Sequence, residues 1–212
     1  MNASEAPLRT WVLIDAQNVY KDAREAFHAP ESDPSSYGQV SPRRLAELLV
    51  SRGPKNAPRS RQLDEVRVYT GFPSPSREPH ANAAHMRQRT AWERDNVKVF
   101  PRSLRYPAAW PKAKAYEKGV DVALAVDLVF AAARRYFDVA VVCSTDTDLV
   151  PALEAVCELK RAWGEPRVEV MCWAPLQKRL RVDGHPVFCH RVDETDYRSI
   201  RDQTIYARSP GP

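Results

Sequence analysis

The chain has 212 residues, of which 43% are hydrophobic and 28% are charged. This length supports one substantial hydrophobic core, and no apolar run approaches the roughly 18 residues that a membrane-spanning helix requires. The 32 Lys and Arg residues exceed the 27 Asp and Glu residues and give a net charge of +5, which permits a nucleic acid partner without requiring one.

Strand-like and helix-like segments alternate along the chain. Short apolar runs rich in β-branched and aromatic residues predict strands, and apolar residues at helical spacing predict the helices between them. In chain order the segments are a strand at Trp11–Ile14, a helix at Pro42–Ser51, a strand at Val66–Tyr69, a helix at Pro79–Arg94, a strand at Val97–Phe100, a helix at Val120–Tyr136, a strand at Val139–Cys143, a helix at Leu149–Trp163, a strand at Val168–Cys172, a weaker strand at Val187–Cys189 and a last helix at Asp193–Tyr206.

This alternation predicts an α/β fold with a mostly parallel sheet flanked by helices. We expect a single domain over residues 8–192, followed over residues 193–212 by a C-terminal helix and a disordered tail. The N-terminal segment lacks the basic stretch and apolar run of a secretory signal, so we expect a cytoplasmic protein.

Several common sites are not indicated. The four cysteines include no C-x-x-C pair and the five histidines include no H-x-x-x-H pair, so the sequence does not predict a zinc site. The glycine-rich motifs that hold nucleotide cofactors are also absent from the sequence.

Polar side chains follow the two most apolar predicted strands. Asp15 and Asn18 come after the first strand, and Asp146 and Asp148 follow Val139–Cys143. Ligands of open parallel sheets bind beyond the carboxyl ends of the strands. If these strands are neighbours, their carboxylates converge, and such groups either hold a hard divalent cation or have raised pKa values. The alternative is that each residue only begins a turn or caps a helix.

A third acidic position lies at the start of the helix predicted over Val120–Tyr136. At about 100° per residue, Asp121 shares a side of this helix with the apolar Leu128 and Ala132. It is therefore a candidate for the same site, although an anion near a helix N-terminus is also favourable by itself. Asp127 lies on another side, close to Arg134, and is expected to be a supporting or solvated residue.

Three segments carry a resemblance to a known family: VLIDAQNVY, EKGVDVALAVDLV and VAVVCSTDTDLVPALEAV. In this order they resemble the NYN branch of the PIN-like nuclease superfamily, and the LabA-type proteins in particular. The resemblance implies a Rossmann-like fold, a site for Mg²⁺ or Mn²⁺, and endoribonuclease activity. It assigns acidic-pocket roles to Asp15, Asn18, Asp121, Asp146 and Asp148, and supporting roles to Ser144 and Asp127.

One position departs from the family pattern. The glycine that usually follows the serine of the third motif is Thr145 here. Glycine permits close backbone approach or a positive φ, and a β-branched residue is stiffer at this point. We therefore expect Thr145 to narrow the pocket or to shift the loop.

A basic and aromatic segment precedes the third acidic position. Between residues 101 and 119 the only acidic residue is Glu117, whereas basic and aromatic residues alternate. Basic groups contact phosphates and aromatic faces stack on unpaired bases. The candidate RNA-binding residues are Arg102, Arg105, Trp110, Lys112, Lys114, Tyr116 and Lys118. The alternative is an ordinary solvated surface in which the aromatic rings pack locally.

These observations favour a metal-dependent ribonuclease. Asp15, Asp121, Asp146 and Asp148 would bind Mg²⁺ or Mn²⁺, Asn18 would orient a ligand or the scissile phosphate, and the substrate would be single-stranded RNA or structured loops. A non-catalytic RNA-binding module that uses residues 102–118 is the main alternative. A phosphatase with Asp15 as nucleophile is disfavoured, because the sequence after the first strand is D-A-Q-N and not D-x-D. A membrane partner is not expected, and assembly into a homo-oligomer is left open.

Overall fold

The computed structural model describes residues 6–28, 33–34, 36–54 and 59–207. The tail expected at residues 208–212 lies outside this part of the chain. Among the described residues, no helix has both the length and the apolar character that crossing a membrane would require.

Six strands form one sheet in the order β3-β2-β1-β4-β5-β6. Their bounds are β1 Leu8–Asp15, β2 Arg61–Phe72, β3 Val97–Ser103, β4 Val139–Cys143, β5 Arg167–Trp173 and β6 Cys189–Val192. Every pairing between neighbours is parallel, and the five main predicted strands fall inside the observed ones. The predicted α/β fold with a largely parallel sheet is therefore confirmed.

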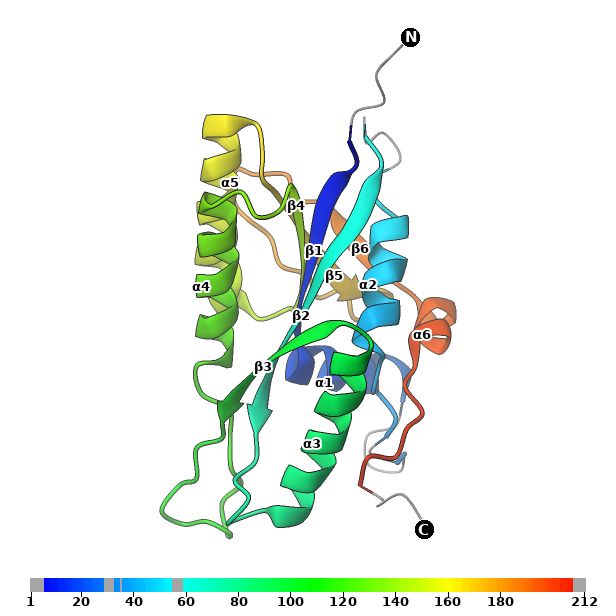
Figure 1. Cartoon of the computed structure of the whole chain (residues 1–212), viewed down its shortest axis with the longest axis vertical. Helices are drawn as coiled ribbons and strands as arrows, with labels where there is room; N and C mark the ends of the chain where they lie inside the picture. Colours follow the sequence, from blue (N-terminus) through cyan, green and yellow to red (C-terminus); the bar gives the residue numbers. More distant parts are fainter. Residues whose placement is uncertain (1–5, 29–32, 35, 55–58, 208–212) are drawn as a thin grey trace.

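Helices cover both faces of the sheet (Figure 1). They are α1 Ala16–Phe27, α2 Pro42–Ser51, α3 Pro79–Arg94, α4 Val120–Ala133, α5 Val150–Trp163 and α6 Glu194–Ile200. Alternate residues of β1 face opposite layers: Trp11 and Leu13 pack with α4 and α5, whereas Val12 and Ile14 pack with α1, α2 and α6. This alternation places one hydrophobic core on each side of the sheet.

The structure contains one long helix that is not among the predicted elements. Helix α1 begins directly after Asp15, and its buried face includes the charged residues Asp22 and Arg24 beside Val19 and Ala23. Arg24 is stabilised there by hydrogen bonds from its guanidinium to the backbone carbonyls of Pro34 and Tyr37. The sequence prediction treats Asp15 and Asn18 as site residues that follow a strand and assigns no helix from Ala16, so it misses α1 although the helix is amphipathic.

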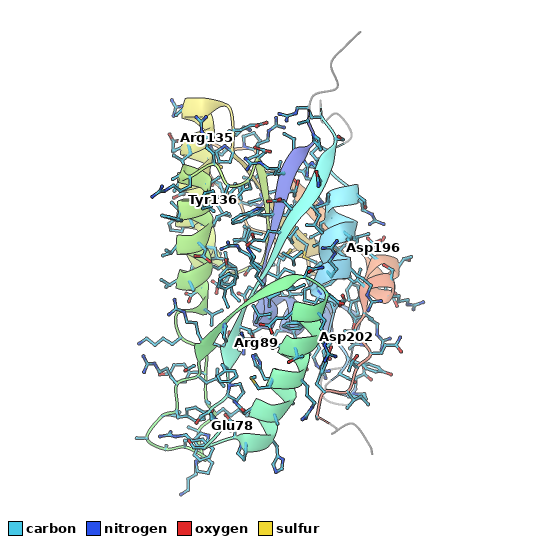
Figure 2. All side chains as sticks on the ribbon, viewed as in Figure 1. Glu78, Arg89, Arg135, Tyr136, Asp196 and Asp202 are labelled. Atoms are coloured by element: carbon cyan, nitrogen blue, oxygen red, sulfur yellow. The ribbon has the colours of Figure 1, made fainter. Side chains whose placement is uncertain are left out.

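Two predicted helices end earlier than expected. Helix α4 stops at Ala133, and Arg135 then adopts a positive φ of 55°, so Tyr136 lies beyond the helix. Helix α6 ends at Ile200, because Arg201 returns to an extended conformation. Tyr197 and Ile200 are almost fully buried, and Asp196 accepts a hydrogen bond from Arg52 at the end of α2 (Figure 2). Helix α6 is thus packed against the domain.

A buried cluster of three polar and charged side chains links three strands on one side of the sheet. Arg61 of β2 donates both terminal nitrogens to the carboxylate of Glu169 on β5, at 2.8 and 2.6 Å. His190 of β6 lies 2.8 Å from the same carboxylate. Burial alone would raise the pKa of Glu169, but Arg61 and His190 outweigh that effect and lower it.

Candidate active site

The acidic residues gather where the strand order reverses direction. Strands β2 and β3 follow β1 on one side of the sheet, and β4, β5 and β6 lie on the other. In such sheets the ligand crevice lies at the carboxyl ends of the two central strands. Here those strands are β1, which ends at Asp15, and β4, which leads into Ser144 and Asp146. The chain topology therefore brings the first and third sequence motifs together.

Ser144 joins the two strand ends. Its hydroxyl donates to Asp15 Oδ2 at 3.3 Å and accepts from the backbone N–H of Asp146 at 3.1 Å. Ser144 is 1% exposed, so this link lies under the floor of the site. The contacts agree with the supporting position that the family resemblance implies for this residue.

Both central carboxylates also cap helices. Asp15 Oδ1 accepts from the Asn18 N–H at 3.1 Å at the start of α1. Asp146 Oδ1 accepts from the Asp148 N–H at 3.0 Å at the start of the short 3-10 helix Thr147–Leu149. Each carboxylate therefore accepts one capping hydrogen bond through one oxygen, and this bond uses about one of its four acceptor sites.

Asn18 and Thr145 lock the loop after β4 onto α1. The side-chain oxygen of Asn18 accepts from the Thr145 N–H at 2.9 Å, and the Thr145 hydroxyl donates to Asp22 Oδ2 at 2.6 Å. Asp22 is buried, so the Thr145 hydroxyl satisfies a carboxylate that burial would otherwise penalise. A glycine at position 145 would lack this hydroxyl and would leave Asp22 without this hydrogen bond.

The acidic side chains influence one another electrostatically. Burial is the largest cause of a raised pKa at Asp15, and the negative charges of Asp146 and Asp121 raise it further. Asp121 occupies the first turn of α4, after Gly119, which caps the helix with a positive φ of 76°. The structure thus brings together Asp15, Asp121 and Asp146.

A fourth carboxylate, Glu117, joins this group although its position in the sequence gives no strand or helix signal. Its Oε1 accepts from the Gly71 N–H at 2.5 Å. A Cβ at Gly71 would lie 2.6 Å from that oxygen, so only glycine permits the approach. Burial raises the pKa of Glu117, and the charges of Asp15 and Asp121 add to the increase. Its place immediately before the KGVD segment is the one sequence signal that could have indicated it.

The other two predicted carboxylates differ in their surroundings. Asp148 is exposed, and its backbone N–H rather than its carboxylate is used in the cap of Asp146. Asp127 lies over the sheet, where it accepts from Arg67 at 2.9 Å and from the Tyr69 hydroxyl at 2.8 Å. Asp127 therefore has a structural ion pair and a hydrogen bond on the α4 face of the sheet.

The donor chemistry of the cluster fits a hard divalent cation. Carboxylate oxygens are the ligands that Mg²⁺ and Mn²⁺ prefer, and the mutual repulsion at Asp15 is the cost that such a cation would remove. Within the described part of the chain, however, no three Asp, Glu, His or Cys side chains already converge closely enough to hold a metal ion. Side-chain rotation would have to bring the oxygens of Asp15, Asp121, Asp146 and Glu117 inward.

The predicted RNA-binding segment forms a loop at the carboxyl end of the sheet (Figure 1). Backbone hydrogen bonds between Arg105 and Tyr116 close its base, at 2.9 and 3.0 Å. The tip carries exposed cationic side chains, and the ring of Tyr116 is 53% exposed. The exposed cationic residues of this segment are Arg102, Arg105, Lys112, Lys114 and Lys118.

Trp110 is less available than the sequence suggests. Its ring packs edge-on against Tyr106, with centroids 5.7 Å apart, and Arg77 lies 4.8 Å over the Tyr106 ring. The Tyr106 hydroxyl in turn donates to Glu78 at 2.6 Å, at the start of α3 (Figure 2). Local packing therefore holds Trp110, whereas Tyr116 presents a free ring to solvent.

Comparison with known proteins identifies the family. The family model described as NYN domain matches residues 9–172. The chain belongs to the NYN domain family. No curated protein sequence matches it. A solved structure with a similar fold is the crystal structure of a protein of unknown function, VPA0982 from Vibrio parahaemolyticus RIMD 2210633, with 15% identity, a TM-score of 0.55, and coverage of 91% of this chain and 97% of that chain.

Membership places this NYN domain in the PIN-like nuclease superfamily and indicates a nuclease at the coarse level. The matched range runs from β1 into β5 and contains all three motifs of the predicted acidic pocket. The similar structure shares the fold alone and carries no statement of activity. The finer chemistry must therefore be argued from the residues of the site.

Proposed function

We propose that this NYN domain is a divalent-metal-dependent endoribonuclease that hydrolyses phosphodiester bonds of cytoplasmic RNA. The observation that supports the proposal is the buried carboxylate of Asp15 at the switch point of the sheet, where burial raises its pKa and the charges of Asp146 and Asp121 raise it further. Such a cluster is unfavourable without a cation, so a functional reason for keeping it is needed.

The proposed metal ligands are Asp15, Asp121, Asp146 and, at the exposed rim, Asp148. Glu117, which lies beside them, is added to the set. Bound Mg²⁺ or Mn²⁺ would polarise the phosphate and lower the pKa of a water molecule. The Asn18 N–H bonds one oxygen of Asp15, and the Asp148 N–H bonds one oxygen of Asp146. Ser144 bonds the second oxygen of Asp15. These bonds would have to yield, or be shared with the cation, when the carboxylates turn inward.

Asn18 has a positioning role in this proposal. Its side-chain oxygen is used by Thr145, so the amide NH₂ group is the end that can donate to a phosphate oxygen. The loop of residues 102–118 supplies positive charge and the exposed ring of Tyr116 beside the cluster. This combination suits single-stranded RNA or a structured loop, in which bases are free to stack.

The variant Asp146→Asn tests the proposal. Asn caps helices about as well as Asp, so the turn after β4 should keep its structure. Cleavage of labelled single-stranded and hairpin RNA in Mg²⁺ or Mn²⁺ should fall by roughly a hundredfold or more, because a full ligand charge is lost. RNA binding should persist or strengthen, since one carboxylate that repels phosphate is gone. Asp183→Asn, at an exposed site outside the cluster, is the matched control.

Three outcomes separate the alternatives. Cleavage that continues in EDTA, or equal cleavage by the wild type and Asp146→Asn, contradicts the metal mechanism. RNA binding without cleavage in any metal ion favours the non-catalytic RNA-binding module. Loss of cleavage in both Asp146→Asn and the Asp183→Asn control indicates a general effect on folding and removes the support for the site.

A further inference from the structure

A pocket of about 480 Å³ lies beside the acidic cluster, on the side of the sheet covered by α1 and α3. The end of β2, the first turns of α1, the inner face of α3 and residues 205–207 form its walls. Gly71 and Glu117 line it as well. Because Glu117 also belongs to the acidic cluster and Gly71 donates a hydrogen bond to it, the pocket and the cluster share a wall.

The charges around the pocket exclude an anionic occupant. Among the described lining residues, Glu117 is the only Asp or Glu, and there is no Lys or Arg. Burial, together with the nearby charge of Arg89, lowers the pKa of His85, so this ring is neutral at pH 7. A phosphate would therefore meet no compensating cation here, and an uncharged group is favoured.

Three lining residues carry buried polar atoms without hydrogen-bond partners in the described structure. The atoms are Gln39 Oε1, His85 Nε2 and Trp92 Nε1. The first accepts only, the last donates only, and the imidazole nitrogen takes either role according to its tautomer. A buried polar group without a partner is unfavourable and calls for an explanation. These three atoms have almost no accessible surface, so a ligand would reach Gln39 Oε1 or His85 Nε2 only after the side chain rotates. The uncharged polar side chains that line the pocket, among them Gln17, Thr70 and Gln88, offer donors and acceptors to an occupant.

We propose that this pocket binds a nucleobase of the RNA strand whose phosphate lies at the acidic cluster. A base is uncharged, flat and lined with donors and acceptors, and the pocket combines the aromatic residues Tyr20, Trp92 and Tyr206 with uncharged polar side chains. The volume lies within the usual range for small-molecule sites. This inference rests on the proposed function, because that function places the phosphate at the cluster. The inference adds a base-recognition subsite to the proposed nuclease site.

Nucleoside binding tests the subsite independently of cleavage. Adenosine, guanosine, cytidine and uridine are titrated into the full chain and followed by ligand-observed NMR. At least one should bind saturably at ~0.1–1 mM, as the ligand efficiency of small molecules suggests. Gln39→Met keeps the shape of the side chain but removes the acceptor, and Trp92→Phe keeps an aromatic ring but removes the donor. Each should weaken that nucleoside about 3- to 10-fold, with native-like circular dichroism.

The control is Met86→Ala, which changes an exposed residue of the same helix that does not line the pocket. Its affinity for the nucleoside should equal that of the wild type. If none of the four nucleosides binds, or if both pocket variants bind as well as the control, the subsite is rejected. Preferential binding of indole, with no binding of the nucleosides, would instead assign the pocket to a mainly apolar ligand and would also reject the proposal.

Cleavage of RNA with a single abasic position provides the second arm. When the missing base is moved along an oligoribonucleotide, one position at a fixed distance from the cut should raise KM, and this increase should be smaller in Trp92→Phe, which has already lost part of the base interaction. Cleavage that tolerates every abasic position overturns the subsite but leaves the nuclease intact. Nucleoside binding with the expected variant effects, but without cleavage of any RNA, overturns the nuclease and leaves the pocket as a nucleoside site.

Discussion

The hydroxyl of Thr145 donates a 2.6 Å hydrogen bond to the buried carboxylate of Asp22. This contact ties the loop after β4 to α1 and explains a threonine where the NYN pattern usually has glycine. Thr145→Val keeps the β-branched shape and removes the donor, so we expect the free energy of unfolding to fall by about 1–3 kcal/mol. Thr145→Ser keeps the hydroxyl and should lose less. Chemical denaturation measures both, and equal losses would show that the hydroxyl is unimportant.

Asp15 has two separable roles, a helix cap and a site carboxylate. Asp15→Asn should retain the cap, because Asn accepts from the N–H of Asn18 about as well, and it removes the charge repulsion with Asp121 and Asp146. The free energy of unfolding at pH 7 should stay constant or rise, whereas Asp15→Ala should lower it by about 1 kcal/mol. Both variants should lose cleavage. A destabilised Asp15→Asn would contradict the repulsion that this cluster implies.

The sign of the pH dependence at Asp15 follows from its raised pKa. The folded state holds this proton more tightly than the unfolded chain, whose ordinary value is 3.8. Its contribution to stability is therefore largest below that value and declines as the pH rises through the folded pKa. Asp15→Asn should remove this decline, which a comparison of unfolding curves at several pH values detects.

Glu169 has the opposite pH behaviour. Arg61 and His190 hold its pKa below the ordinary 4.5 despite burial, so its stabilising contribution is complete above that pH and is lost as the pH falls through the folded pKa. Glu169→Gln leaves the Arg61 charge buried and should lower the free energy of unfolding at pH 7 by about 3–5 kcal/mol. Glu194→Gln, which breaks an exposed pair with Arg198, is the control and should cost less than about 1 kcal/mol. Similar losses in both would refute this role of the buried group.

The loop of residues 102–118 gives a prediction about salt. Lys112 and Lys114 are exposed at its tip, and each contact with a phosphate releases counterions. Lys112→Ala/Lys114→Ala should weaken RNA binding and flatten its dependence on salt by about 0.7 units of logarithmic slope per lost contact with single strands. Titrations with labelled RNA at several salt concentrations measure the slope. An unchanged affinity and slope would exclude these lysines from the RNA interface.

The local sequence pattern predicts the central strands because these elements are strongly apolar. WVLI and VAVVC are buried on both faces of the sheet, so their character is visible without tertiary information. Helix α1 is amphipathic but is missed, because its first residues follow a strand directly and are interpreted as a polar site segment. The partners of its buried Asp22 and Arg24 lie in other segments, so those contacts could not be predicted from local pattern.

The same limit applies to the candidate site. The positions of Asp15 and Asp146 follow from strand ends, and their proximity follows from the parallel sheet. Glu117 could not be assigned in this way, because it lies in a loop and reaches Gly71, which is 46 positions away. Trp110 resembles a stacking platform by composition alone, but its packing against Tyr106 depends on contacts that composition does not encode.

The pairing of β1 with β4 has a consequence for the order of events during synthesis. The hydrogen bond from Ser144 to Asp15 joins residues 129 positions apart, so it cannot form until the chain has been synthesised through β4. A growing chain that has not yet released β4 holds Asp15 without Asp146, and so without the pair that the proposed chemistry requires. The ribosome would therefore complete most of the domain before the product could cut any RNA, including the messenger from which it is being translated.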